Sequence, residues 1–136
     1  MEEQREKIRV VYCEPGQLAR ITEIGTELAD LQQAVGGLIE TYYPFEEAVC
    51  IVCNDEGKFN GMRPCRAVYG EDGKMMDIIF GPFFICDCSG EEFASLSDEQ
   101  LERYANQFRY PENYLRINGE IKAIKYDPTR DRDKAR

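Results

Sequence analysis

Residues 31–61 decide the fold of this chain, and they read LQQAVGGLIETYYPFEEAVCIVCNDEGKFNG. A helix capped by Thr26 enters this stretch with apolar residues at helical spacing. Gly36-Gly37 closes that helix, because glycine adopts the left-handed conformation without a Cβ clash. β-Branched and aromatic runs then predict two strands, at 38–43 and 48–53. Asn- and Gly-containing segments predict two turns, at 54–57 and 60–61. The expected order is helix, strand, strand and turn.

The rest of the chain adds more strands and a second helix. Four apolar or β-branched runs predict strands at 8–13, 18–24, 76–80 and 83–88. Ser97 and Gln100 form a capping box in front of an apolar helical face, which predicts a helix. Asn118-Gly119 is a preferred pair for a two-residue hairpin turn, here between 114–117 and 120–126. Residues 62–69 have no clear period and predict an ordered loop.

These elements predict a single α+β domain over residues 8–126. It has a mainly antiparallel sheet, two helices packed on it and a C-terminal hairpin. Residues 1–7 and 127–136 are polar or highly charged, which predicts flexible termini. Five glycines mark the helix end and the turns of this framework: Gly36, Gly37, Gly57, Gly61 and Gly81.

Charge and composition exclude several classes of function. The 136 residues carry 26 acidic and 17 basic side chains, a net charge of −9. Phosphate backbones and anionic bilayers are bound by concentrated Lys and Arg, so neither nucleic acid nor a membrane is an expected partner. The first residues are charged where a signal peptide needs an apolar core, and the longest apolar run, 75–86, is too short to span a bilayer. We expect a cytoplasmic protein with reduced cysteines.

Catalytic and cofactor chemistry have little support. The sequence has no histidine, the commonest general base, so we expect no catalytic residues. Gly36-Gly37 lacks the Lys and Ser/Thr of a phosphate-binding loop, and no cofactor is expected. Cys50-x-x-Cys53 with Cys86-x-Cys88 has zinc-ligand spacing, but residues three apart in a strand point to opposite faces. Buried core thiols are the favoured interpretation, with redox sensing by Cys86 and Cys88 as the alternative.

One polar group remains as a candidate binding site, formed by Glu40, Asn60, Arg63 and Arg66. Glu40 interrupts an otherwise apolar strand, and the two arginines follow shortly after in the expected loop. One interpretation is a structural ion pair that anchors the loop to the sheet. The other is a small pocket for an anion or a peptide.

Two aromatic pairs, Tyr42-Tyr43 and Phe83-Phe84, occur in predicted strands. Neighbours in a strand face opposite ways, so one member of each pair must meet a second layer or water. An exposed apolar patch of this kind would serve a homodimer or a partner interface.

The central motifs carry a resemblance to a known family. Val35-Gly36-Gly37-Leu38-Ile39-Glu40, followed by Val49–Asn54, Asp55-Glu56-Gly57-Lys58 and Asn60-Gly61, resembles the family called domain of unknown function 3846. The resemblance covers roughly residues 8–110. It implies a small protein of phages, plasmids or conjugative elements, often encoded near genes that counter host restriction. It implies no mechanism and no site residues.

The leading hypothesis is therefore a non-enzymatic accessory protein of a mobile genetic element that binds another protein. A specific version is an acidic mimic of DNA, whose carboxylates occupy the basic groove of a DNA-binding enzyme. The alternative is a small ligand-binding domain or enzyme with a pocket around Glu40, Arg63 and Arg66. A third hypothesis is a structural or redox-responsive module.

Overall fold

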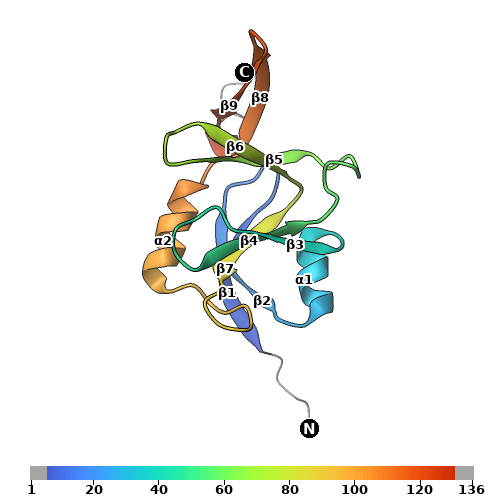
Figure 1. Cartoon of the computed structure of the whole chain (residues 1–136), viewed down its shortest axis with the longest axis vertical. Helices are drawn as coiled ribbons and strands as arrows, with labels where there is room; N and C mark the ends of the chain where they lie inside the picture. Colours follow the sequence, from blue (N-terminus) through green and yellow to red (C-terminus); the bar gives the residue numbers. More distant parts are fainter. Residues whose placement is uncertain (1–5, 131–136) are drawn as a thin grey trace.

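A computed structural model describes residues 6–130, and it confirms an α+β fold with a mainly antiparallel sheet (Figure 1). The main sheet has the strand order β2-β1-β7-β4-β3. Its strands are β1 (Lys7–Cys13), β2 (Arg20–Gly25), β3 (Ile39–Tyr42), β4 (Val49–Asn54) and β7 (Phe83–Asp87). Two further antiparallel hairpins are β5 (Pro64–Tyr69) with β6 (Met75–Phe80), and β8 (Glu112–Ile117) with β9 (Glu120–Lys125).

Both faces of the main sheet are covered. Helix α1 (Leu28–Val35) lies on one face, and helix α2 (Asp98–Gln107) lies on the other together with the β5–β6 hairpin (Figure 1). All six residues of β4 are consequently buried. The strand alternation divides the core into two clusters, one against each helix.

The two covered faces of the sheet determine which rings of the aromatic pairs are buried. Phe83 packs in the cluster beneath α2 and Phe84 in the cluster beneath α1, and both are fully buried. They therefore add no exposed patch. Tyr43 has an exposed fraction of 63%, whereas Tyr42 packs partly against the core, so the Tyr42-Tyr43 pair does leave one ring in solvent.

Helix α1 begins one residue later than the sequence predicted. Its N-cap is Glu27, not Thr26, because the Asp30 carboxylate accepts from the Glu27 amide at 3.3 Å. Leu31 and Val35 form its buried face. It ends as predicted at Gly36, which has a φ of 82°, in the left-handed region.

Helix α2 follows its sequence signals closely. The Ser97 hydroxyl accepts from the Gln100 amide at 3.1 Å, and the Gln100 side chain accepts from the Ser97 amide at 3.0 Å. This confirms the capping box. Leu101 and Tyr104 form the buried face of the helix.

The predicted loop over 62–69 was wrong, since Pro64–Tyr69 is strand β5 and pairs with β6. Proline is tolerated at the first residue of a strand, where no amide is needed for the ladder. Four consecutive residues, Cys65 to Val68, are buried, so the alternation that would reveal a half-buried strand is missing. The register also shifts between Pro64 and Arg66, which further blurs the pattern.

The C-terminal hairpin was predicted correctly. Asn118 and Gly119 have φ values of 53° and 83°, as a two-residue turn with positive φ at both positions requires. The hairpin projects beyond β5 and β6 at one end of the molecule (Figure 1).

The described chain begins and ends close to the boundaries predicted for the domain. Lys7 is the first residue of β1, and Asp127 starts a helical turn by accepting from the Thr129 amide at 2.9 Å. The prediction of flexible termini otherwise concerns residues 1–5 and 131–136, which lie outside the described residues.

Gly57 shows why a small residue is needed in the turn after β4. A Cβ at this position would lie 2.5 Å from the Phe80 carbonyl oxygen. The turn therefore packs directly against the backbone of β6, and this approach forms one wall of the pocket described next.

Candidate functional site

No side-chain hydrogen bond or ion pair within residues 6–130 joins any two of the four residues of the predicted binding group. Glu40 is exposed on β3, and Asn60 and Arg63 are exposed in the connection between β4 and β5. Arg66 has an exposed fraction of 0% and lies in the core. The predicted ion pair is wrong for Arg66, because its guanidinium does not contact Glu40 among the described residues.

Arg66 instead ties three segments together through backbone carbonyls. Its Nε donates to the Phe108 carbonyl at 2.9 Å and its Nη2 to the Gln17 carbonyl at 2.7 Å. Its Nη1 donates to its neighbour, the Cys65 carbonyl, at 3.0 Å. Phe108 ends α2 and Gln17 lies between β1 and β2, so one side chain fixes the helix end against two strands. Its role is structural.

Glu40 lines a pocket of about 180 Å³ between β3, the turn after β4, and β6. The carboxylates of Glu40, Asp55, Glu56 and Asp77 border it, and Lys58 is the one cation among its lining residues. Lys58 Nζ lies 3.9 Å from Asp77 Oδ1 and 5.7 Å from the centre of the Phe80 ring. The pocket is where the two sequence pieces of the family resemblance meet, since one supplies Glu40 and the other the turn from Asn54 to Lys58.

The electrostatics of this pocket are negative. Burial, followed by the charges of Glu40, Asp77 and Asp55, raises the pKa of the Cys53 thiol to about 12. Within residues 6–130, however, no three Cys, Asp or Glu side chains converge closely enough to hold a metal ion. The negative charge of the pocket disfavours anions.

The cysteine arrangement agrees with the strand geometry expected from the sequence. Cys50 lies in the core cluster under α1 and Cys53 in the cluster under α2, so the two thiols of this pair face opposite sides of the sheet. Cys50 Sγ lies 4.0 Å from Cys86 Sγ on the neighbouring strand. That contact, followed by burial, raises the pKa of Cys50, and burial raises the pKa of Cys88 to about 11. A raised pKa keeps a thiol protonated and slow to react, which weighs against redox sensing by Cys88.

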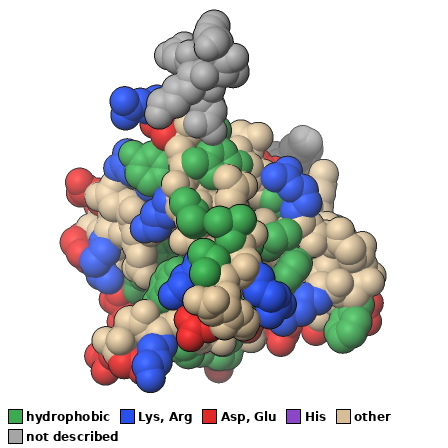
Figure 2. All heavy atoms as spheres, turned by 90° about the horizontal axis from the view of Figure 1, so that it is seen from above, with side chains coloured by type: hydrophobic (Ala, Val, Ile, Leu, Met, Phe, Trp, Pro, Cys, Tyr) green, Lys and Arg blue, Asp and Glu red, His purple; other side chains and the backbone are tan. Residues whose placement is uncertain are grey.

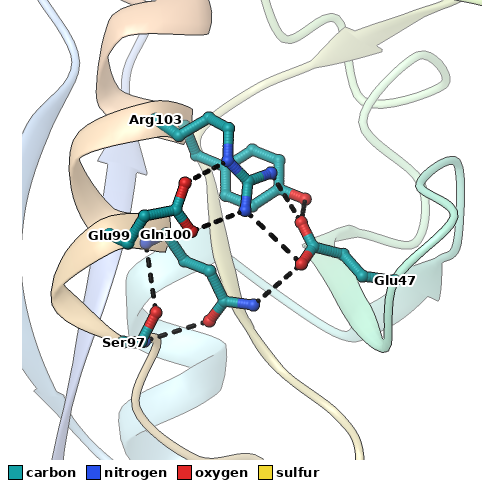
Figure 3. A network of polar contacts seen from close by, with 6 residues as sticks. Glu47, Ser97, Glu99, Gln100 and Arg103 are labelled. Atoms are coloured by element: carbon teal, nitrogen blue, oxygen red, sulfur yellow. Dashed lines mark hydrogen bonds and ion pairs between the residues drawn. The ribbon is translucent and has the colours of Figure 1, made fainter.

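A network of polar contacts joins α2 to the connection between β3 and β4 (Figure 3). Glu47 accepts from Arg103 Nη1 at 2.6 Å, from Gln100 Nε2 at 3.0 Å and from the Tyr104 hydroxyl. Arg103 also donates from Nε to Glu99 at 2.7 Å. The Arg103 bond, with those from Tyr104 and Gln100, lowers the pKa of Glu47 to about 2.

Glu47→Gln tests this network. The pKa of Glu47 lies below its ordinary value of 4.5 in the folded state, so the carboxylate stabilises the fold above pH 4.5 and this contribution disappears as the pH falls through 2. We expect E47Q to lower the free energy of unfolding at pH 7 by about 1 kcal/mol, a value reduced by the partial exposure of the group. Urea unfolding across pH 2–7 should show a shallower acid dependence than the wild type.

The exposed neighbour Glu46 supplies the control for that experiment. E46Q removes the same charge and should change the free energy of unfolding by less than about 0.5 kcal/mol. An E47Q variant that matched both E46Q and the wild type would show that the network contributes nothing.

The hairpin end of the molecule has a different surface from the acidic remainder. Leu115, Ile117, Ile121 and Ile124 have exposed fractions of 40–49% on β8 and β9. Figure 2 looks onto this end and shows hydrophobic side chains in its middle, flanked by Lys and Arg, with most Asp and Glu nearer the margin. These four side chains are exposed, so they can contact another molecule.

These features define a small α+β domain whose main sheet is covered on both faces. The chain belongs to the family Domain of unknown function (DUF3846), which matches residues 8–109 and so confirms the resemblance seen in the sequence. No curated protein and no solved structure matches the chain. None of the helices in residues 6–130 has the length and apolar character needed to cross a membrane. The family match ends before β8, so the hairpin lies outside it.

Proposed function

We propose that this protein is a non-enzymatic accessory protein of a mobile genetic element that acts by binding another protein. The setting in a phage, plasmid or conjugative element is what the family resemblance implies. Binding to a protein is supported by the exposed apolar side chains of the β8–β9 hairpin. The proposal places the protein in the cytoplasm, where its cysteines stay reduced.

The observation that carries this proposal is the projecting hairpin. A two-stranded ribbon on its own is only marginally stable in water, and this one exposes apolar side chains on both faces. Leu115, Ile117 and Ile124 alternate onto one face and Ile121 onto the other. Exposed apolar area is costly unless a partner covers it, so protein binding gives this element a purpose.

Acidic mimicry is the more specific form of the proposal. A net charge of −9 would attract a basic protein, and carboxylates at phosphate-like spacing would compete with DNA for its groove. Binding of this kind depends steeply on salt, because the basic partner exchanges its counterions. It predicts a partner that handles DNA, such as a restriction enzyme, and it provides a defined experimental signature.

Affinity capture from a bacterial host lysate, at 50 and at 300 mM salt, tests the proposal. Captured proteins are identified by mass spectrometry and retested as purified proteins. We expect one reproducible partner, bound directly. Capture of a DNA-handling enzyme only at the low salt concentration would support mimicry, and salt-resistant capture would favour the apolar hairpin. Failure of every captured protein to bind after purification would overturn the proposal.

The second candidate is a ligand-binding domain that uses the pocket beside Glu40. Its supporting observation is that residues from both pieces of the family resemblance line the same concave surface. Arg63 and Arg66 do not line it, so a cationic or neutral ligand fits its charge better than an anion. Thermal stabilisation by a compound in a metabolite panel, lost in E40Q, would favour this function over protein binding.

A further inference from the structure

A groove of about 760 Å³ separates the β5–β6 turn from the C-terminal hairpin. Its lining residues from the turn side are Tyr69, Gly73, Lys74 and Met75, and from the hairpin side Arg116 and residues 119–123. Apolar contact area comes from Tyr69, Met75 and Ile121, of which Tyr69 and Ile121 have exposed fractions of 45% and 40%. The groove is thus large and partly apolar.

The charge of this groove is opposite to that of the protein. Three cations, Lys74, Arg116 and Lys122, line it together with a single acid, Glu120. Lys122 Nζ lies 3.4 Å from Glu120 Oε1, so this pair largely neutralises itself. The side chains of Lys74 and Arg116 form no ion pair or hydrogen bond with any other residue in 6–130. Within residues 6–130, this groove therefore contains two unpaired cations, on a protein with a net charge of −9.

A free strand edge borders the groove. Strand β9 pairs with β8 and with no other strand of the described chain. Its outer edge consequently presents unpaired backbone N–H and C=O groups, the template that an added strand uses. Strand addition gains affinity from main-chain hydrogen bonds and specificity from the side chains on either side.

We propose that this groove binds an extended, acidic segment of the partner protein, which adds as a strand to β9 and places carboxylates near Lys74 and Arg116. The inference rests on the proposed function and names the chemistry of the partner. Alternate apolar residues of the segment meet Tyr69 and Ile121. The two cations select an acidic segment, and the open strand edge selects an extended one.

Other occupants fit the surface less well. A nucleic acid is a long polyanion and would extend from the groove onto acidic surface, where its phosphates are repelled. An anionic bilayer meets the same repulsion. A second copy of this chain would bring another hairpin with the same unpaired cations, and like charges would oppose each other across the interface.

Selection from a displayed library of random twelve-residue peptides tests the proposal on the full chain. Enriched peptides are synthesised with a fluorescent label, and their affinities are measured by polarisation at 50 and 200 mM salt. We expect acidic sequences with alternating apolar residues. The double variant K74E/R116E should weaken their binding at least tenfold. Both positions are exposed, so the variant should keep its fold.

The matched control is K7E/R109E, which makes the same change in charge at two exposed positions outside the groove. It should bind the peptides almost as the wild type does. Equal weakening by both double variants would show that only net charge matters, and it would overturn the groove as a site. Enrichment of non-acidic peptides, or of none, would do the same, as would tight binding of a labelled DNA or RNA oligonucleotide or self-association blocked by K74E/R116E.

The outcome also separates this inference from the proposed function. A partner captured from lysate that still binds K74E/R116E with full affinity would leave protein binding intact and place it elsewhere on the surface. Peptide binding in the groove without any partner in the lysate would support the groove as a binding site and would contradict the proposed function in that host.

Discussion

Replacement of Arg66 by methionine is expected to lower the free energy of unfolding by about 3–5 kcal/mol, the scale for disrupting a buried charged group and its bonded partners. Methionine fills much of the same volume but donates no hydrogen bond. The carbonyls of Phe108 and Gln17 would then lose the donors that they have in the fold. Because small domains have about 5–15 kcal/mol of stability in total, the variant would be close to unfolding.

Urea denaturation followed by circular dichroism measures this effect, with R63M as its control. Arg63 is three residues away and exposed, so R63M should change the free energy by less than about 0.5 kcal/mol. R66K retains the charge but not the fork of donors, and an intermediate loss is expected from it. If R66M were as stable as R63M, the hydrogen bonds of the guanidinium would contribute nothing to the stability of the fold.

The contrast between these two arginines shows where sequence reasoning reached its limit. Both occur in the same short stretch, and charge alone predicts exposure for each. Only the tertiary structure brings the end of α2 and the β1–β2 connection around Arg66. The burial of this arginine leaves no local signal, because the two carbonyls that hold it in the core are 42 and 49 residues away.

Elements with local signals were predicted well. The Ser97–Gln100 capping box and the Asn118-Gly119 turn each depend on contacts between residues at most three apart, and both form as expected. Strand β5 was not predicted, because its residues are buried on both faces and the sequence therefore lacks the alternation of apolar and polar residues that indicates a strand. The single-residue error at Thr26 has the same origin as most boundary errors, since several neighbouring side chains compete to cap a helix.

The polar contacts also divide into those with a local sequence signal and those that only the fold creates. Glu99 and Arg103 are four residues apart on α2, so their ion pair was readable from the sequence, whereas Glu47 joins them from 56 residues away. The groove beside the hairpin was missed for a related reason. In the sequence, Lys74 and Arg116 are ordinary surface charges far apart. The fold places their two hairpins on either side of one groove.

Truncation of Phe84 to alanine is the second change with a large expected effect, a loss of about 3–5 kcal/mol in the free energy of unfolding. The ring is fully buried between the sheet and α1, and its removal leaves a cavity that the surrounding strands cannot fill. F83A should cost a similar amount on the opposite face, beneath α2. Equal losses from adjacent residues are expected only if the sheet is covered on both sides.

Tyr43→Ala is the matched aromatic control, because that ring is exposed and its loss should change stability by less than about 0.5 kcal/mol. F84L keeps most of the volume and should fold even if F84A does not, with a loss of about 1–2 kcal/mol. Chemical denaturation of all four variants gives the comparison. A small loss of stability for F84A beside a large loss for F83A would mean that α1 does not cover its face of the sheet. That face would then be a second exposed apolar surface, and it would be an alternative to the hairpin as the site of partner binding.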